Sequence, residues 1–385
     1  MNMESLRYIN SILERDAKNT TYKFALLRGT IYVCQKYSHR KAEADGRVRY
    51  PLGPLVESWV LYYYPIIASP EFIPQGSGES DGSSGTRQIK FRPEFKKVTD
   101  YYQDHKGFNG FWEDYRNGEI PEDISPDVMA LFSIIRETII INPMKFLGRS
   151  KSDEHNSVYQ SEKAGIKIPG DAYPDPEYIL DNFGYFYIPT EVSMAFEYLG
   201  SFISGEESIL EGWAEFSHNK SKETIPKENI LRALTTEPET RRAVHLAKQF
   251  YHDAFMEGPL ECVWSGKIIR DESKMAVDHM IPFALWKNND LWNLLPAEKK
   301  ENGKKSDLIP SRILLERRKD IITEYWDRLY QAHPAHFSKE ITLSLLEKPF
   351  SEQENWKEEA FANLLQKVDY LIEVRGYEAW DPLSS

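Results

Sequence analysis

The residues whose types and spacing could carry out chemistry lie in one stretch of this 385-residue chain, residues 262–310. An Asp278-His279 pair is followed, fourteen residues after the histidine, by Asn293. Asn302 comes nine residues further on, with Lys305 close behind it. A group of this kind at the end of a short strand is a compact frame for holding one metal ion against a phosphate.

Among these residues, His279 fits the role of a general base. Hydrolysis of a phosphodiester needs an activated water, a cation that neutralises the developing charge, and a way out for the leaving oxygen. An unperturbed imidazole has a pKa of about 6.5 and so accepts a proton at neutral pH. The alternative is a satisfied, buried histidine at the end of a strand.

The elements that must position these residues can be read from the surrounding apolar pattern. Apolar residues flank the Asp278-His279 pair within 276–282 and Asn293 within 291–296, which predicts two short strands. Asn302 lies in 297–302, a run of residues that favours a short helix ended by Gly303. The expected order is strand, loop, strand, helix.

This segment resembles an HNH nuclease, the ββα-metal fold, and in wording and spacing it is especially similar to the HNH domain of the CRISPR RNA-guided effector nucleases. The shared phrases are Asp-His-Met-Ile-Pro (278–282), Asn-Leu-Leu (293–295) and Asn-Gly-Lys-Lys-Ser-Asp-Leu-Ile-Pro (302–310). The resemblance says nothing of RNA guidance, because the chain shows none of the motifs of the other CRISPR effector domains.

The resemblance implies that Asp278 and Asn302 hold the metal ion. One carboxylate and one amide oxygen leave most coordination positions to water and phosphate, which suits Mg²⁺ or Mn²⁺. A loop-capping aspartate and a helix-terminal asparagine are the alternatives. Many members of the family have a histidine where this chain has Asn302, and Glu298 and Glu301 lie nearby.

Two further residues complete the expected catalytic set. In the family, the counterpart of Asn293 orients the histidine, because its side chain bonds the backbone of the loop after the first strand; a plain turn asparagine is the alternative. Lys305 would neutralise the phosphate or the transition state, unless it is an ordinary solvated lysine.

Cysteine usage bears on zinc and on the compartment. Many HNH proteins carry paired CxxC motifs that bind a structural zinc, but Cys262 has no second cysteine nearby, so no structural zinc is expected. The other cysteine, Cys34, lies far away in the chain, which argues against a disulfide framework and suits a reducing cytoplasm.

The net charge of the chain opposes nucleic-acid binding, but the distribution of basic residues along the sequence does not. The net charge is −12, whereas basic residues outnumber acidic ones from 297 to 319. Beside the motif, this stretch predicts a phosphate-facing patch that includes Lys299, Lys300, Lys304 and Arg312. A solvated helical face of mixed charge is the alternative.

The remaining pattern is mainly helical. Periodic apolar positions predict helices within 4–37, 55–67, 94–109, 127–138, 191–203, 227–255, 313–330 and 352–374, and a short strand at 185–189. The expected fold class is therefore mainly α with a small embedded α+β module. We expect a helical recognition or interaction region at 1–255, the ββα-metal (HNH) module at 256–312, and a helical C-terminal tail at 313–385.

Together these features predict a divalent-metal-dependent HNH endonuclease that hydrolyses DNA, in bacterial restriction or anti-phage defence. The expected partners are DNA, a second copy of the chain, and a regulatory ATPase or other defence-system subunit, with no membrane. A partner-gated nuclease subunit and a non-catalytic nucleic-acid-binding module are the two alternatives. RNA as the substrate also stays open, since the module contacts phosphates rather than bases.

Overall fold

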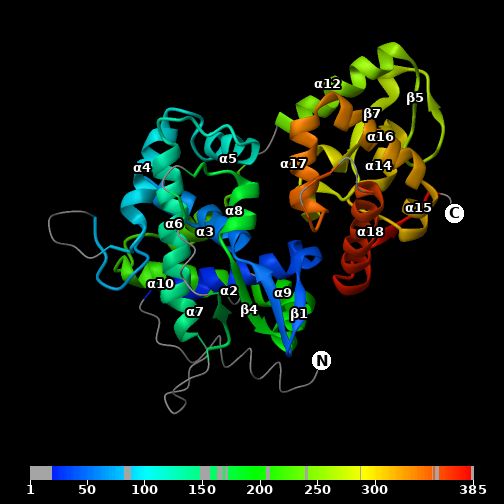
Figure 1. Ribbon diagram of the computed structural model, residues 1–385. Coiled ribbons are helices and arrows are strands. Elements are labelled where there is room, and N and C mark those ends of the chain that lie inside the picture. Colours follow the sequence, from blue (N-terminus) through cyan, green and yellow to red (C-terminus); the bar gives the residue numbers. More distant parts are fainter. Residues whose placement is uncertain are drawn as a thin grey trace. The chain divides into compact units, whose positions relative to one another are not determined.

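The computed structural model describes residues 20–81, 88–147, 157–162, 168–169, 172–204, 209–238, 242–286, 288–348, 350–351 and 355–382. The chain folds into two compact units, Met1–Pro238 (unit 1) and Glu239–Ser385 (unit 2). Figure 1 shows their elements coloured along the sequence. The chain is mainly helical with small separate sheets, as the sequence predicts.

The helices of unit 1 gather around α3 (Gly53–Ile67), which is buried on almost every side. A helix that is apolar all round must lie inside other elements, and α3 packs against α2, α4, α6, α8 and α11. The helices of the unit are α2 (Tyr22–Lys36), η1 (Ser38–Arg40), α4 (Arg92–Gln103), α5 (Gly107–Asn117), α6 (Ser125–Ile141), α7 (Pro143–Phe146), α8 (Pro176–Asn182), α9 (Thr190–Ser204), α10 (Glu211–Lys220) and α11 (Lys227–Thr235).

Unit 1 also contains a four-stranded sheet in the order β1-β2-β4-β3. Its strands are β1 (Ala42–Ala44), β2 (Arg47–Pro51), β3 (Gln160–Ser161) and β4 (Tyr185–Pro189). β4 is the short strand predicted at 185–189. The β1–β2 hairpin turns at Asp45-Gly46, where both residues have positive φ angles (52° and 72°). An Asp-Gly pair is a strong hairpin signal that could have revealed these strands from the sequence.

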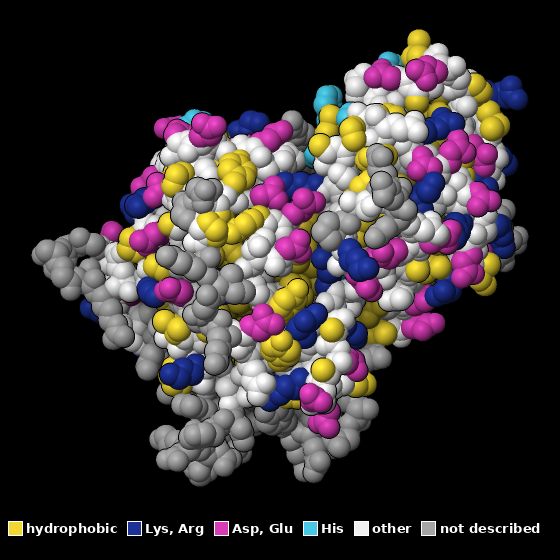
Figure 2. Space-filling view, viewed as in Figure 1, with side chains coloured by type: hydrophobic (Ala, Val, Ile, Leu, Met, Phe, Trp, Pro, Cys, Tyr) yellow, Lys and Arg dark blue, Asp and Glu magenta, His cyan; other side chains and the backbone are white. Residues whose placement is uncertain are grey.

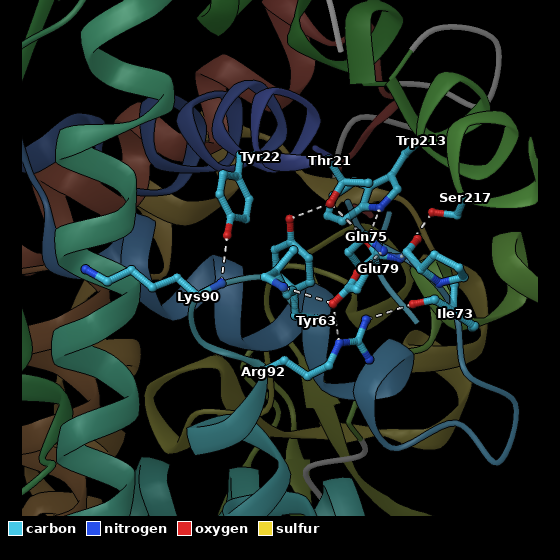
Figure 3. Close-up of polar contacts among 12 residues, drawn as sticks. Thr21, Tyr22, Tyr63, Ile73, Gln75, Glu79, Lys90, Arg92, Trp213 and Ser217 are labelled. Atoms are coloured by element: carbon cyan, nitrogen blue, oxygen red, sulfur yellow. Dashed lines mark hydrogen bonds and ion pairs between the residues drawn. The ribbon is translucent and has the colours of Figure 1, made fainter. Parts of the chain in front are cut away.

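A network of buried polar side chains ties the segment after α3 to the rest of unit 1 (Figure 3). Thr21 Oγ1 lies 2.8 Å from the Tyr63 hydroxyl and donates to Gln75 Oε1 at 2.9 Å. Gln75 also bonds two side chains of α10. Arg92 Nε donates to Glu79 Oε1 at 2.6 Å. Because these groups satisfy one another, the network fixes the segment in place.

Unit 2 is built around an antiparallel hairpin of β7 (Met275–His279) and β8 (Leu294–Glu298). Its helices are α12 (Arg242–Glu257), η3 (Glu272–Lys274), α13 (Phe283–Trp286), η4 (Leu291–Asn293), α14 (Lys299–Lys305), α15 (Arg312–Arg317), α16 (Lys319–Ala332), α17 (Pro334–Ser344), α18 (Trp356–Asp369) and η5 (Tyr370–Val374). Two further pairs of short strands are β5 (Leu260–Glu261) with β6 (Ile268–Ile269), and β9 (Ile309–Pro310) with β10 (Ala379–Trp380).

The core of unit 2 is rich in tryptophan. Trp264, Trp292 and Trp326 are fully buried, and Trp380 of the C-terminal strand packs edge-on against Trp264 with ring centroids 5.9 Å apart. Trp326 Nε1 donates to the Trp292 carbonyl at 2.8 Å. Burial of such large rings supplies much of the hydrophobic stabilisation of a small unit. The core around the hairpin is thus built from segments that precede the hairpin in the sequence and from segments that follow it.

Several predicted boundaries differ from the structure. The helix expected over 227–255 is two helices, since Pro238 cannot continue α11 and α12 begins at Arg242. α14 continues through Gly303 to Lys305 and ends where Ser306 takes a positive φ of 47°. The first predicted helix, within 4–19, lies outside the described residues. α12 packs against β7 and β8 and so belongs to unit 2, whereas the sequence division placed residues 242–255 with the N-terminal region.

No helix in the described ranges is both long enough and apolar enough to cross a membrane.

Candidate active site

The hairpin and the helix that follows it bring Asp278, His279, Asn293 and Lys305 together. His279 pairs with Leu294 and Asp278 with Leu295, so the Asp-His pair stands at the end of β7. Asn293 directly precedes β8. α14 follows β8 at once and packs against both strands. The expected order of strand, loop, strand and helix is the one observed.

Asp278 is buried and held by two donors. Trp264 Nε1 donates to its Oδ2 at 2.6 Å, and the ammonium of the fully buried Lys305 lies 3.4 Å from its Oδ1. Lys305 also donates to the His279 carbonyl at 2.7 Å. Burial raises the pKa of the Asp278 carboxyl, while Lys305 and Trp264 oppose that shift. Each charge of the pair favours the ionised form of the other.

His279 is half-buried and bonds the side chain of Asn289, with its Nε2 2.7 Å from Asn289 Oδ1. Since an amide oxygen only accepts, Nε2 carries the hydrogen and Nδ1 keeps a free lone pair. Burial lowers the pKa of His279, and the charges of Lys305 and Lys248 add to that effect; Asn289 and Asp278 oppose it. A neutral imidazole with Nδ1 available is the form that a general base needs.

Asn293 is fully buried and bonds only backbone groups. Its Oδ1 accepts from the Ile281 amide at 2.8 Å, and its Nδ2 donates to the carbonyls of Ile281 (3.0 Å) and Asn288 (3.1 Å). These bonds close the loop between β7 and β8, in the way that the family resemblance implies. Asn293 therefore positions the loop and has no free group with which to react.

Asn302 lies on α14, one turn before Lys305. Residues three apart on a helix share a face, so Asn302 faces the same side of the hairpin as Lys305, whose ammonium reaches Asp278. Within the described part of the chain, its half-buried side-chain amide has no hydrogen-bond partner. Its oxygen is therefore available as a ligand.

The donor set fits a hard cation that keeps much of its own water shell. No three His, Cys, Asp or Glu side chains in the described ranges form a metal-binding group. Asp278 and Asn302 offer two oxygen donors, and Mg²⁺ accepts a small number of protein oxygens together with water and phosphate. Cys262 is buried, with its sulfur accepting from the Glu298 amide at 3.3 Å.

Two residues that hold the site escaped the sequence analysis. Asn289 sets the tautomer of His279, and Trp264 orients Asp278. Asn289 belongs to an Asn-Asn-Asp run in the loop, where turn-forming residues are ordinary. Trp264 lies fourteen residues before Asp278 in the sequence, and only the three-dimensional fold brings them together.

The predicted phosphate-facing residues divide into two pairs. Lys299 and Lys300 are exposed at the start of α14, and no carboxylate in the described ranges pairs with them. Lys304 instead pairs with Glu301, and Arg312 with Glu316 and Asp369; these three carboxylates therefore compete with any phosphate. Figure 2 accordingly shows acidic and basic side chains interspersed over the visible face, with no continuous basic surface.

Comparison with known proteins divides the chain near the boundary between the units. Residues 2–234 match a family described as a domain of unknown function (DUF8808). The chain belongs to this family. Residues 262–311 match the HNH endonuclease family, which covers β7, β8 and α14 and indicates a nuclease, a hydrolase of nucleic acids. The narrower likeness to CRISPR effectors stays a prediction. No curated protein and no solved structure matches the chain.

Proposed function

We propose that this DUF8808 protein is an endonuclease that uses a divalent metal ion to hydrolyse DNA, leaving 5′-phosphate and 3′-hydroxyl ends. One observation carries the proposal. Asp278 and His279 end β7 beside the α14 face that bears Asn302, inside the segment that matches HNH endonucleases. Asn289 keeps Nδ1 of His279 free to accept a proton.

The chain's own residues can activate water at this place. Nδ1 of His279 would take a proton from a water molecule as the water oxygen bonds to phosphorus. The bond from phosphorus to the 3′ oxygen breaks, and that oxygen leaves as a hydroxyl after taking a proton from solvent. Asp278 and Asn302 would hold Mg²⁺ or Mn²⁺, which would neutralise charge on the phosphate and on the leaving oxygen.

Lys305 acts in this proposal through Asp278 and His279. Its ammonium is buried and bonded to the Asp278 carboxylate and to the His279 carbonyl, so it fixes the two residues relative to each other. Neutralisation of the phosphate by Lys305 was the expectation from the sequence, and it would require the ammonium to leave these partners.

The setting that we propose is bacterial restriction or anti-phage defence. The arrangement of the chain supports it, because a nuclease unit is joined to a larger unit that could recognise a target or a partner subunit.

The direct test uses labelled duplex DNA and a matched RNA duplex, each with Mg²⁺, Mn²⁺ or EDTA. We expect cleavage of DNA that requires the metal, and products that DNA ligase can rejoin, because ligation needs a 5′-phosphate beside a 3′-hydroxyl. Cleavage of RNA alone would move the substrate to RNA. Cleavage in EDTA would contradict the metal-dependent mechanism.

A further inference from the structure

Helix α12 lies outside the segment that matches HNH endonucleases, yet it lies against the hairpin that carries Asp278 and His279. It packs against β7, β8 and η4, and Figure 1 shows it next to β7. The hydroxyl of Tyr251 donates to the Leu294 carbonyl at 3.0 Å, and Leu294 is the strand partner of His279. His252 pairs with Glu272, just before β7 begins. These two interactions fix α12 beside the strand that ends in His279.

Lys248 stands on α12 one turn before this pair of residues. Residues three and four apart on a helix share a face, so Lys248 lies on the side of Tyr251 and His252, and its charge acts on the imidazole of His279. The side chain is exposed, and no carboxylate in the described ranges pairs with its ammonium.

Three other cations of unit 2 have acidic partners, whereas Lys299 and Lys300 of α14, like Lys248, have none in the described ranges. Lys305 pairs with Asp278, Lys304 with Glu301, and Arg318 with Glu261. Lys248 differs from these three because no described carboxylate pairs with its exposed ammonium, and from Lys299 and Lys300 because it lies on α12, which packs against the strand that ends in His279. An exposed ammonium keeps its hydration and its conformational freedom, and a polyanion that displaces counter-ions can bind it.

We propose that Lys248 binds a phosphate of the substrate strand next to the one that is cleaved, so that the nuclease site extends from the HNH segment onto α12. This inference rests on the proposed function. Such a contact places the strand without reading its bases, because every nucleotide carries the same phosphate.

The test compares Lys248→Gln, Lys248→Glu and Lys248→Arg with the wild type. Lys357→Gln is the matched control, since Lys357 is a partly exposed lysine of unit 2 that already pairs with Asp327. Two quantities are measured: the affinity for a fluorescent DNA duplex in EDTA over a range of salt concentrations, and kcat and KM in Mg²⁺.

We expect Lys248→Gln to weaken DNA binding about three- to tenfold and to reduce the slope of log affinity against log salt by about 0.9, the value for one phosphate contact. KM should rise with little change in kcat, because the contact is equal in the ground and transition states. Lys248→Glu should weaken binding further, Lys248→Arg should restore it, and Lys357→Gln should match the wild type.

Equal affinity, salt slope and KM in wild type and Lys248→Gln would overturn the inference while leaving the nuclease proposal intact. A wild type that binds DNA without cutting it would refute the nuclease proposal, and a weaker Lys248→Gln would then still support the phosphate contact. A wild type that neither binds nor cuts DNA would refute both.

Discussion

At the scale of single residues, the Asn289 side chain decides which nitrogen of His279 can accept a proton. Its oxygen bonds Nε2, so Nδ1 is left as the base. Burial lowers the pKa of His279 below its ordinary value, so protonation should inactivate the site only at acid pH. Activity should therefore be lost as the pH falls through the pKa of His279.

Replacement of Asn289 by aspartate should move that loss of activity to higher pH. A carboxylate beside Nε2 favours the protonated imidazole, so Asn289→Asp raises the pKa of His279. The measurement is kcat/KM for DNA cleavage across the acid and neutral range, in wild type and variant. If kcat/KM of the variant falls at the same pH as that of the wild type, or at a lower pH, then Asn289 does not act on His279.

Trp264 should control metal affinity through Asp278. Trp264→Phe keeps an aromatic ring but removes the N–H that donates to the carboxylate at 2.6 Å. Loss of a partner of this kind typically weakens metal binding about 10- to 100-fold. The Mg²⁺ concentration that gives half-maximal cleavage should rise accordingly, with most of the rate recovered at saturating Mg²⁺.

The control for this variant is Trp356→Phe, which changes another buried tryptophan of unit 2. It should leave the Mg²⁺ requirement unchanged. If both variants shift the requirement equally, the effect comes from general destabilisation, and Trp264 has no particular role at Asp278.

At the scale of elements, the sequence predicts the parts of the site that are contiguous and fails for those that are not. β7 and β8 follow from the apolar residues that flank Asp278 and Asn293, and α14 follows from the helix-forming run that contains Asn302, because short strands and helices carry local patterns. Trp264 reaches Asp278, and α12 lies against the hairpin, only through tertiary packing. No local pattern specifies that packing.

Helix α18 carries an ionisable group whose burial should make the stability of unit 2 depend on pH. Lys367 is 4% exposed, and burial lowers its pKa to about 7. Its ammonium lies 5.3 Å from the ring centroid of Trp286 in α13. At a pH between that value and the ordinary pKa of 10.5, Lys367 is protonated in the unfolded chain and neutral in the folded chain. Stability should therefore rise with pH across this window.

Lys367→Met should remove that dependence and stabilise unit 2 near neutral pH. From about pH 7.5 to about pH 9.5, the wild type should gain roughly 1.4 kcal/mol per pH unit in unfolding free energy relative to the variant. Hydrogen exchange of peptides from α18 measures this free energy in the whole chain. Parallel curves for the two proteins would mean that Lys367 has the same pKa folded and unfolded.

At the scale of the whole molecule, each unit is compact in itself and has its own family match. The sequence predicts a helical N-terminal region joined to a nuclease segment, and the match at residues 262–311 agrees with the second part. The sequence prediction places α12 with the N-terminal region because it continues one helix over 227–255, although Pro238 is a helix-breaking residue. The short interruption around Pro238 separates the two units.

Because the described part of each chain offers one candidate nuclease site, a single encounter with duplex DNA should cut one strand. Linear product should then come from a second nick or from a second copy of the chain.

The most direct measurement is the cleavage of supercoiled plasmid in Mg²⁺ by wild type and by His279→Ala. The wild type should convert supercoiled plasmid first to the open circle. His279→Ala should slow this step by about 100- to 10,000-fold, the usual contribution of a general base, while it binds DNA normally. Cleavage by His279→Ala at the rate of the wild type would place the active site elsewhere in the chain.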